Sequence, residues 1–254
     1  MSGHSHWATI KRAKGAADAK KGKIFSKLGK EITIVVKAKG KDPDNNPTLR
    51  TLIAKAKAAQ MPNDNIERAI KKGTGELESE ALVDAQYEGI KGGVAVVVTV
   101  LTDNKNRAAA EVGNVFKKNG LELAKPGSAS RLFDRMGQVM IPAADGVTED
   151  RVMEVALEAG AEDVVAEDGG FTVKCQPSEF TGVLEAIKTA GIAVDEENSN
   201  IGLVPNMMNQ VTTVEQAKAV NKFVDMLEDL EDVQDVYTNM ETTDEVNAAL
   251  EAEG

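Results

Sequence analysis

The sequence changes from basic to acidic near residue 75, and this change limits how the 254 residues can be organised. Residues 1–75 hold 17 Lys and Arg against six Asp and Glu, whereas residues 76–254 hold 13 against 35. Such an asymmetry indicates separate domains, of which the basic one contacts a polyanion. The alternative is a basic surface that only keeps the protein soluble.

The basic segment has the apolar spacing of helices. In residues 20–37 apolar side chains recur every three or four positions, and the lysines fall on a separate side of the same helix. The run Ile32–Val36 ("ITIVV") also suits a strand, which is the alternative there. Asn46 and Pro47 predict the N-cap and first turn of a second helix, and a third ends near Gly73. We therefore expect a three-helix domain.

The acidic remainder alternates strand and helix patterns, which favours α+β domains with helices on one face of a small sheet. We expect one ferredoxin-like α/β domain from residues 82–142 plus 206–240, and a second one, inserted into the first, from residues 143–205. Residues 241–254 are expected to form a frayed acidic tail.

Local signals place individual elements within these domains. Gly92 and Gly93 predict a turn between two strands. Thr148 and Thr213 have the position of helix N-caps, and residues 192–205 have a strand-like composition.

Histidine and cysteine are scarce, which excludes several chemistries. The histidines are His4 and His6, both in the basic segment, so the acidic domains cannot hold a Ser-His-Asp or Cys-His site. Cys175 is the single cysteine, which indicates a reducing, cytoplasmic compartment, and no apolar run is long enough to span a bilayer. We expect no catalysis, cofactor, metal site, small-molecule substrate or membrane contact. An enzyme that uses carboxylates and a metal is an alternative.

The basic segment is the candidate nucleic-acid-binding surface, because lysines neutralise phosphates and planar rings stack on unpaired bases. Trp7 either stacks in this way or caps the helical core. Lysine lacks the bidentate geometry that reads base edges, so recognition of the backbone or of shape is favoured. The residues expected to contact nucleic acid are His4, His6, Trp7, Lys11, Arg12, Lys14, Lys20, Lys21, Lys23, Lys27 and Lys30.

Four blocks of the sequence resemble the YebC/PmpR family. They are "GHSHWATIKRAKGAADAKKGKIFSKLGKEI", "KAKAAQMPNDNIERAIKKGTG", "YEGIKGGVAVVVTVLTDNKNRAAAEV" and "NGLELAKPGSASRLFDRMG". The resemblance extends from residue 3 to about residue 240. The chain departs from the family pattern at three positions: His6 replaces a lysine, Gly29 replaces a larger residue, and Arg131 replaces an aromatic residue.

The resemblance implies a helical N-terminal domain followed by two α/β domains. It also implies DNA-binding transcriptional regulation, or translational activation at ribosomes, including the relief of stalling. Met61, Lys71, Lys72 and Arg107 fall at matched positions and join the candidate nucleic-acid-binding residues by this resemblance.

Two hypotheses follow. The first is a non-enzymatic regulator of gene expression that binds DNA or ribosomal RNA. Under this hypothesis the ribosome is a further candidate partner. The second is a protein-interaction or ligand-sensing module formed by the two acidic domains, with the basic domain incidental.

Overall fold

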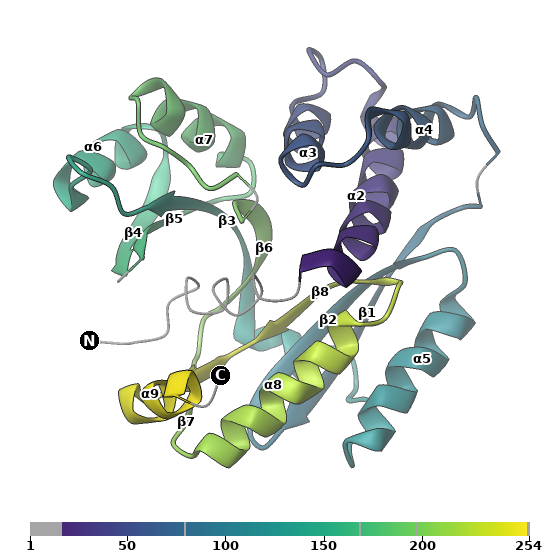
Figure 1. Ribbon diagram of the computed structural model, residues 1–254, viewed down its shortest axis with the longest axis vertical. Helices are drawn as coiled ribbons and strands as arrows, with labels where there is room; N and C mark the ends of the chain where they lie inside the picture. Colours follow the sequence, from purple (N-terminus) through teal and green to yellow (C-terminus); the bar gives the residue numbers. More distant parts are fainter. Residues whose placement is uncertain (1–16, 79, 168, 197, 253–254) are drawn as a thin grey trace. The chain divides into compact units, whose positions relative to one another are not determined.

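The computed structural model describes residues 17–78, 80–167, 169–196 and 198–252, and the side chains of residues 17–20, 167 and 251 lie outside this description. Within these residues the chain divides into two units. One contains residues 80–134 with 203–252, and the other contains residues 17–78 with 135–202. The α+β class expected from the sequence is confirmed (Figure 1).

The basic segment forms helices, as predicted. They are α2 (Ala17–Lys39), α3 (Pro47–Ala58) and α4 (Asn63–Thr74). Helix α2 passes through Ile32–Val36, so the alternative of a strand there is wrong. The N-cap prediction for Asn46 is confirmed, because its side-chain oxygen accepts the Leu49 N–H at 3.1 Å. Helix α4 ends at Thr74, and Gly75 follows in a left-handed conformation.

A small apolar core holds the three helices together. Its buried residues are Ile32, Val36, Leu49, Leu52, Ala56, Met61, Ile66 and Ala69. Gly73 allows α4 to approach α2 closely, because a Cβ atom there would lie 2.6 Å from Val36 Cβ and 2.7 Å from the Thr33 carbonyl oxygen. The Thr33 hydroxyl donates across the same contact to the Ala69 carbonyl at 3.1 Å. This packing fixes which side of α2 faces outward.

Between residues 133 and 205 the chain forms a four-stranded sheet with two helices. In chain order the elements are β3 (Phe133–Pro142), α6 (Glu149–Glu158), β4 (Ala161–Glu167), β5 (Gly170–Cys175), α7 (Phe180–Thr189) and β6 (Asn200–Pro205). The strand order is β4-β5-β3-β6, which is the βαββαβ arrangement of ferredoxin-like domains. The N-cap prediction for Thr148 is confirmed, because its side chain accepts the Arg151 N–H.

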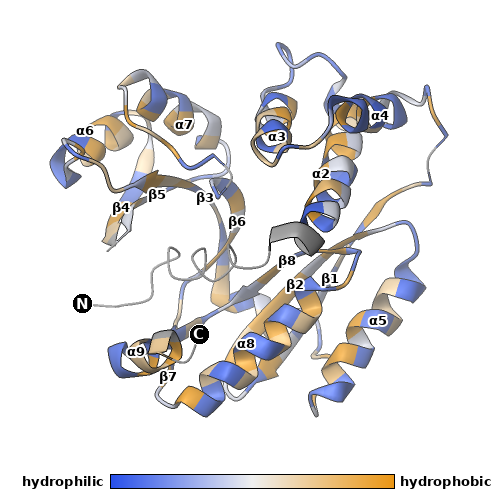
Figure 2. Cartoon of the chain, in the orientation of Figure 1, coloured by the Kyte–Doolittle hydropathy of each residue, from blue (hydrophilic) through white to orange (hydrophobic). Residues whose placement is uncertain are grey.

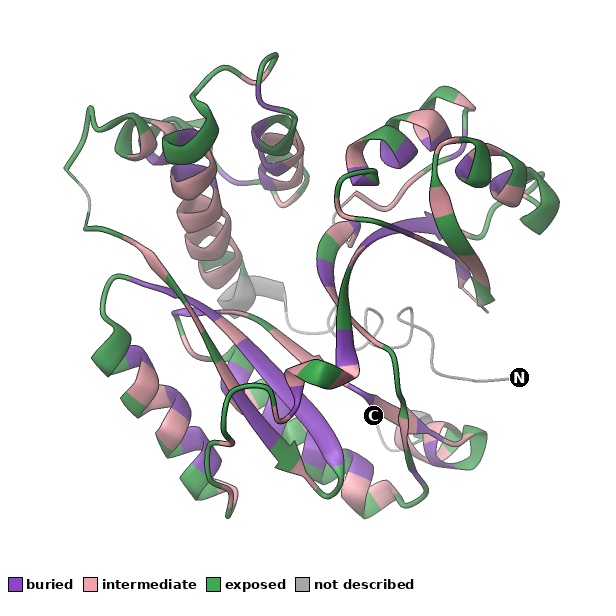
Figure 3. Ribbon diagram, turned by 180° about the vertical axis from the view of Figure 1, so that it is seen from behind, coloured by how far each residue is buried: buried purple, intermediate pink, exposed green. Residues whose placement is uncertain are grey.

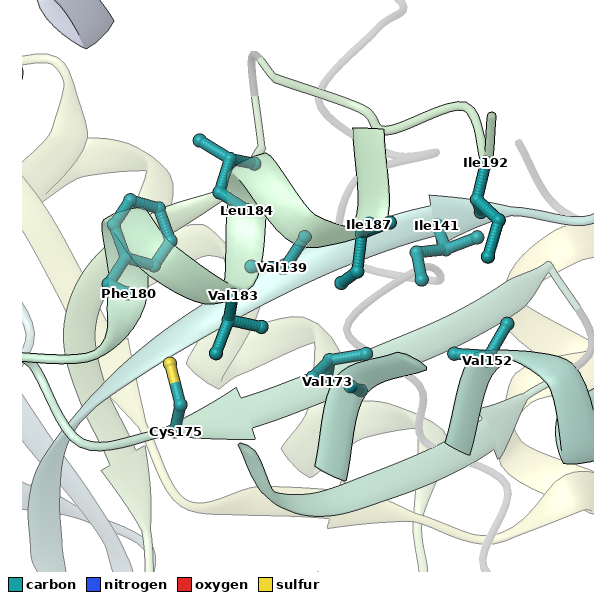
Figure 4. Packing of buried hydrophobic residues seen from close by; sticks show 11 residues of the cluster. Val139, Ile141, Val152, Val173, Cys175, Phe180, Val183, Leu184, Ile187 and Ile192 are labelled. Atoms are coloured by element: carbon teal, nitrogen blue, oxygen red, sulfur yellow. The ribbon is translucent and has the colours of Figure 1, made fainter. Parts of the chain in front are cut away.

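Apolar side chains of α6 and α7 pack on one face of this sheet. Figure 4 shows Phe180, Val183 and Ile187 of α7 beside Val139 and Ile141 of β3. Burial of this cluster is the main favourable contribution to the stability of the segment.

Two strand assignments differ from the prediction. Strand β3 pairs with β5, so it belongs to the four-stranded sheet and not to the domain of residues 82–142, where the sequence pattern placed it. Residues 192–199 lie outside β6, which begins at Asn200. The Ser199 side chain accepts the Met140 N–H at 2.9 Å just before β6 begins.

The other unit contains a three-stranded antiparallel sheet. Its elements are β1 (Val83–Lys91), β2 (Val94–Thr102), α5 (Lys105–Lys118), the short 3-10 helix η1 (Ser130–Leu132), α8 (Val214–Glu228) and β8 (Val233–Thr238), with strand order β1-β2-β8. The turn predicted at Gly92 and Gly93 is confirmed, and both have positive φ. The N-cap prediction for Thr213 is also confirmed.

Helices α5 and α8 lie on the same face of this sheet (Figure 1). Hydrophilic and hydrophobic residues alternate along both helices in Figure 2, as expected for amphipathic helices. The rings of Phe116 and Phe223 meet edge to face between them, with centroids 4.9 Å apart. Figure 3 shows buried residues running along β2 and exposed residues on the outer turns of α5.

The C-terminal segment is folded and not frayed. Strands β7 (Asn209–Val211) and β9 (Met240–Thr242) pair in parallel, and helix α9 (Asp244–Ala252) follows. Val246 of α9 is 3% exposed and packs with Val220 and Val224 of α8. Most residues of α9 are acidic or small, and only one side of the helix is apolar. The sequence therefore suggested a tail.

Candidate nucleic-acid interface

Lysines lie along one side of α2, opposite its core residues. Lys23, Lys27 and Lys30 are spaced by four and three positions, so they project from one side of the helix. All three are partly exposed, whereas Ile32 and Val36 on the other side are buried. These three lysines define the lysine side of α2, and its role as a nucleic-acid interface stays a prediction from the sequence.

Lys21 is exposed at the N-terminal end of the same helix. Its ammonium nitrogen lies 3.4 Å from the Gln60 amide oxygen, so the loop after α3 lies beside Lys21. Lys21 is nine positions from Lys30 and eleven from Ile32, so it projects from the side of α2 that carries Ile32 and not from the lysine side. Helix α3 adds Arg50, Lys55 and Lys57 and contains no acidic residue. Gln60 was not among the expected residues, and only the absence of a glycine at the end of α3 could have drawn attention to it.

Several expected contact residues lie outside the described residues. These are His4, His6, Trp7, Lys11, Arg12 and Lys14, together with the side chain of Lys20. Their assignment to the interface stays a prediction from the sequence, as does the choice between stacking and capping for Trp7.

Lys71 and Lys72 are exposed in the last turn of α4. Glu76 follows them and forms an ion pair with Lys41, with 3.1 Å between Nζ and Oε1. Hydrogen bonds from Lys41 and Thr74, together with the positive charges of Lys41 and Lys71, hold the pKa of Glu76 below its usual value. The end of α4 thus carries positive charge beside an ionised carboxylate, which reduces its attraction for phosphates.

Met61 is a core residue, and its assignment to the interface is wrong. It is 6% exposed and belongs to the cluster that joins the three helices. Its N–H donates to the Ala56 carbonyl at 2.8 Å, which turns the chain inward after α3. A Cβ atom added at Gly29 of α2 would lie 3.9 Å from Met61 Cε, so a larger residue at position 29 would be in van der Waals contact with this methionine.

Arg107 is part of an ion-pair network in the unit that contains β1 and β2. Its guanidinium nitrogen lies 2.8 Å from Asp103 Oδ1 and 2.7 Å from Asp232 Oδ2. Hydrogen bonds with Asp232 and Asp103 raise the pKa of Arg107 above its usual value. The Asp232 side chain is 5% exposed and also accepts the Thr102 hydroxyl at 2.8 Å. Two carboxylates share this one guanidinium, which weakens its attraction for a phosphate. The assignment of Arg107 to the interface stays a prediction from the resemblance.

Replacing Arg107 with glutamine is expected to lower the free energy of unfolding by about 2–3 kcal/mol, because the Asp232 carboxylate loses its cationic partner. Urea unfolding of the full chain measures this effect, with the exposed Arg131→Gln as the matched control. Affinity for duplex DNA is expected to stay within about twofold of that of the unsubstituted chain, because the charge of Arg107 is already compensated by Asp103 and Asp232. A large loss of affinity at unchanged stability would support the assignment of Arg107 to the interface.

The segments that follow residue 75 contain few reactive side chains. Cys175 is buried, and burial, together with the charges of Glu162 and Glu179, raises the pKa of its thiol to about 11. At neutral pH this thiol is protonated and is not a nucleophile. In the part of the chain that the structure describes, no three His, Cys, Asp or Glu residues come together to hold a metal ion. No helix within the same part is long and apolar enough to cross a membrane.

Comparisons with known proteins agree with this architecture. A probable transcriptional regulatory protein of Treponema denticola is 51% identical over 242 residues, covering 95% of this chain and 96% of the relative. One from Desulfatibacillum aliphaticivorans is 50% identical over 247 residues, covering 96% and 98%. The crystal structure of a conserved hypothetical protein from Aquifex aeolicus matches with a TM-score of 0.83 at 43% identity, covering 94% of this chain and 98% of that one.

Family comparison covers both the basic and the acidic parts. Residues 5–76 match the TACO1/YebC protein N-terminal domain, and residues 82–240 match the TACO1/YebC second and third domain. The resemblance found in the four sequence blocks is thereby confirmed. The chain belongs to the TACO1/YebC family.

Proposed function

We propose that this chain is a non-enzymatic regulator of gene expression that binds nucleic acid by its phosphate backbone, through the lysine side of α2. Regulation is supported by the relatives that are named probable transcriptional regulatory proteins. The target is DNA or ribosomal RNA, because both present the regularly spaced phosphates that lysines neutralise.

The observation that carries the proposal is the separation of charge between folded segments. Residues 17–75 carry 14 Lys and Arg against six Asp and Glu, whereas residues 135–202 carry four against 14. Phosphates are attracted to the first segment and repelled by the second. The acidic segments then favour binding in which only the helical segment touches nucleic acid.

A non-enzymatic role is supported by the chemistry of the acidic segments. Their single thiol is protonated at neutral pH, and they contain no histidine. These segments therefore lack the Ser-His-Asp and Cys-His arrangements of nucleophilic catalysis.

The proposal is tested by reversing the charge of Lys23, Lys27 and Lys30 together (K23E/K27E/K30E). Affinity for a labelled 30-base-pair duplex and for a structured ribosomal RNA fragment is expected to fall about 30-fold or more at 0.1 M salt, because three phosphate contacts become repulsive. Fluorescence anisotropy measures both affinities, and circular dichroism checks that α2 remains helical.

The matched control reverses three exposed lysines of α5, Lys105, Lys117 and Lys118, in the acidic unit. This variant has the same change in net charge and is expected to bind within about threefold of the unsubstituted chain. Equal losses in both variants would mean that only net charge matters, and would count against a defined interface. Unchanged regulation in cells by K23E/K27E/K30E would favour the alternative of an interaction module in the acidic domains.

A further inference from the structure

The C-terminal ends of α2 and α4 lie side by side (Figure 1). A Cβ atom at Gly73, in the last turn of α4, would lie 2.6 Å from Val36 Cβ in the last turn of α2. One turn earlier in both helices, the Thr33 hydroxyl donates to the Ala69 carbonyl at 3.1 Å, so the two helices run in the same direction. The lysines in their last turns therefore lie at one end of the helical segment.

Lys37 extends the lysine side of α2 to this end. It follows Lys30 by seven positions, which is close to two full turns, so it projects from the same side as Lys23, Lys27 and Lys30. With a rise of about 1.5 Å per residue, the line from Lys23 to Lys37 is about 21 Å long. Lys37 is exposed and forms no ion pair with any residue that the structure describes.

Three further lysines lie at this end. Lys71 and Lys72 are exposed in the last turn of α4. Gly40 follows α2 in a left-handed conformation, with φ of 89°, and the exposed Lys41 comes next. The paired-end lysines are Lys37, Lys41, Lys71 and Lys72.

The Glu76 carboxylate lies beside the paired-end lysines. The Leu77 N–H donates to the Lys71 carbonyl at 3.2 Å, which turns the chain after α4 back onto the end of the helix. Glu76 thereby reaches Lys41, with 3.1 Å between Oε1 and Nζ. The two side chains are 50% and 63% exposed, so their ion pair is weak and can be exchanged for another.

The potential at this end is positive despite the two helix dipoles. A helix C-terminus carries a partial negative charge, which disfavours a carboxylate. The pKa of Glu76 is nevertheless lowered, chiefly by its hydrogen bond with Lys41. Asp42 does not take the place of Glu76 at Lys41, because its oxygens accept the Asp44 N–H at 3.0 Å and the Asn45 amide at 2.6 Å. The lysines thus attract an anion more strongly than the helix ends repel it.

We propose that the paired-end lysines form a second phosphate-binding surface, continuous with the lysine side of α2, at which a nucleic-acid phosphate replaces Glu76 on Lys41. This inference rests on the proposed function and extends its interface beyond α2. A polyanion held by Lys23, Lys27 and Lys30 presents further phosphates at a high effective concentration, so the exchange becomes favourable on the bound chain. In the free chain Glu76 keeps Lys41 paired.

Five full-length proteins test the exchange: the unsubstituted chain, E76Q, K41Q, K41Q/E76Q and the control E78Q. Each is titrated with a labelled 30-base-pair duplex between 50 and 200 mM salt, and fluorescence anisotropy gives the affinity and its dependence on salt. E78Q is the matched control because Glu78 is exposed, lies two residues from Glu76 and forms no ion pair in the described part of the chain. It removes the same charge as E76Q.

E76Q is expected to bind about threefold more tightly than the unsubstituted chain, because Lys41 is no longer shared with a carboxylate, whereas E78Q changes the affinity by less than about 1.5-fold. K41Q is expected to bind about threefold more weakly. It also reduces the slope of log affinity against log salt concentration by about 0.9 in magnitude, the contribution of one phosphate contact. In the K41Q background E76Q is expected to change the affinity by less than about 1.5-fold. The thermal midpoints are expected to agree within about 2 °C, since the ion pair is exposed.

If K41Q leaves both affinity and slope unchanged, Lys41 contacts no phosphate and the inference is refuted. Equal tightening by E76Q and E78Q, or equal tightening by E76Q with and without Lys41, also refutes it, because Glu76 then repels the polyanion only from a distance. A loss of affinity in K23E/K27E/K30E, with no effect of K41Q or E76Q, refutes this inference and leaves the proposed function standing. If none of these variants changes the affinity, both proposals are refuted.

Discussion

Replacing Glu88 with glutamine is expected to lower the free energy of unfolding of the unit that contains β1 by about 3 kcal/mol at pH 7. The Glu88 side chain projects from β1 and the residue is 3% exposed. Its carboxylate accepts the N–H groups of Gly127, Ala129 and Ser130 at 3.0, 2.7 and 3.0 Å. Glutamine keeps one acceptor oxygen but turns an NH2 group toward backbone donors, so buried N–H groups lose their partners.

The same contacts make the contribution of Glu88 depend on pH. Burial by itself raises the pKa of this carboxyl, but the N–H groups of Gly127, Ala129 and Ser130 and the Ser130 hydroxyl lower it, to about 2. The ordinary value in an unfolded chain is 4.5. A carboxyl whose pKa is lower in the folded state than in the unfolded state stabilises the fold at pH values above its unfolded-state pKa. The contribution of about 3 kcal/mol is therefore complete above pH 4.5 and is lost as the pH falls toward 2.

Urea unfolding followed by tyrosine fluorescence measures this effect, because Tyr87 and Tyr237 both lie in the affected unit. The difference in stability between Glu88→Gln and the unsubstituted chain is expected to be largest near pH 7 and to shrink between pH 4.5 and 2. Glu122→Gln is the matched control, since Glu122 is exposed in the same unit. A difference that stays constant across this pH range would show that Glu88 acts through packing and not through its charge.

Much of the fold could be predicted because its signals are local. The N-caps Asn46, Thr148 and Thr213 each precede an apolar helical pattern, and each is a cap in the structure. Strand β3 was assigned to the wrong sheet because its apolar run suits either sheet. Its partner is decided by pairing with β5, some 30 residues later, and no local pattern encodes that choice.

Candidate site residues could be predicted where their role depends on charge and on spacing along one helix. They could not be predicted where the role depends on a contact with a residue far away in the sequence. The lysine side of α2 follows from spacing along one helix. Arg107 was included by the family resemblance, and the local sequence does not reveal its ion pair with Asp232, which lies 125 residues away. Met61 was included by the family resemblance, whereas the terminal hydrogen bonds of α3 turn it into the core. Gln60 has a φ of 63°, a left-handed conformation that its residue type disfavours.

Raising the salt concentration is expected to weaken nucleic-acid binding by orders of magnitude. If the basic segment contacts six phosphates of a duplex, the logarithm of the affinity falls with the logarithm of salt concentration with a slope of about −5. Affinity then drops by about 10³ between 50 and 200 mM salt, because counterions released on binding are more costly to release into concentrated salt. Fluorescence anisotropy at four or five salt concentrations measures the slope.

The slope also counts the lysines that take part. K23E/K27E/K30E is expected to reduce its magnitude by about 3, because each lysine that meets a phosphate contributes about 0.9. The triple reversal on α5 is expected to leave the slope unchanged, which separates a local interface from the effect of net charge. A slope near zero in the unsubstituted chain would mean that phosphates are not neutralised on binding. The lysine side of α2 would then have no role in affinity, and any recognition would have to come from base contacts or from the acidic domains.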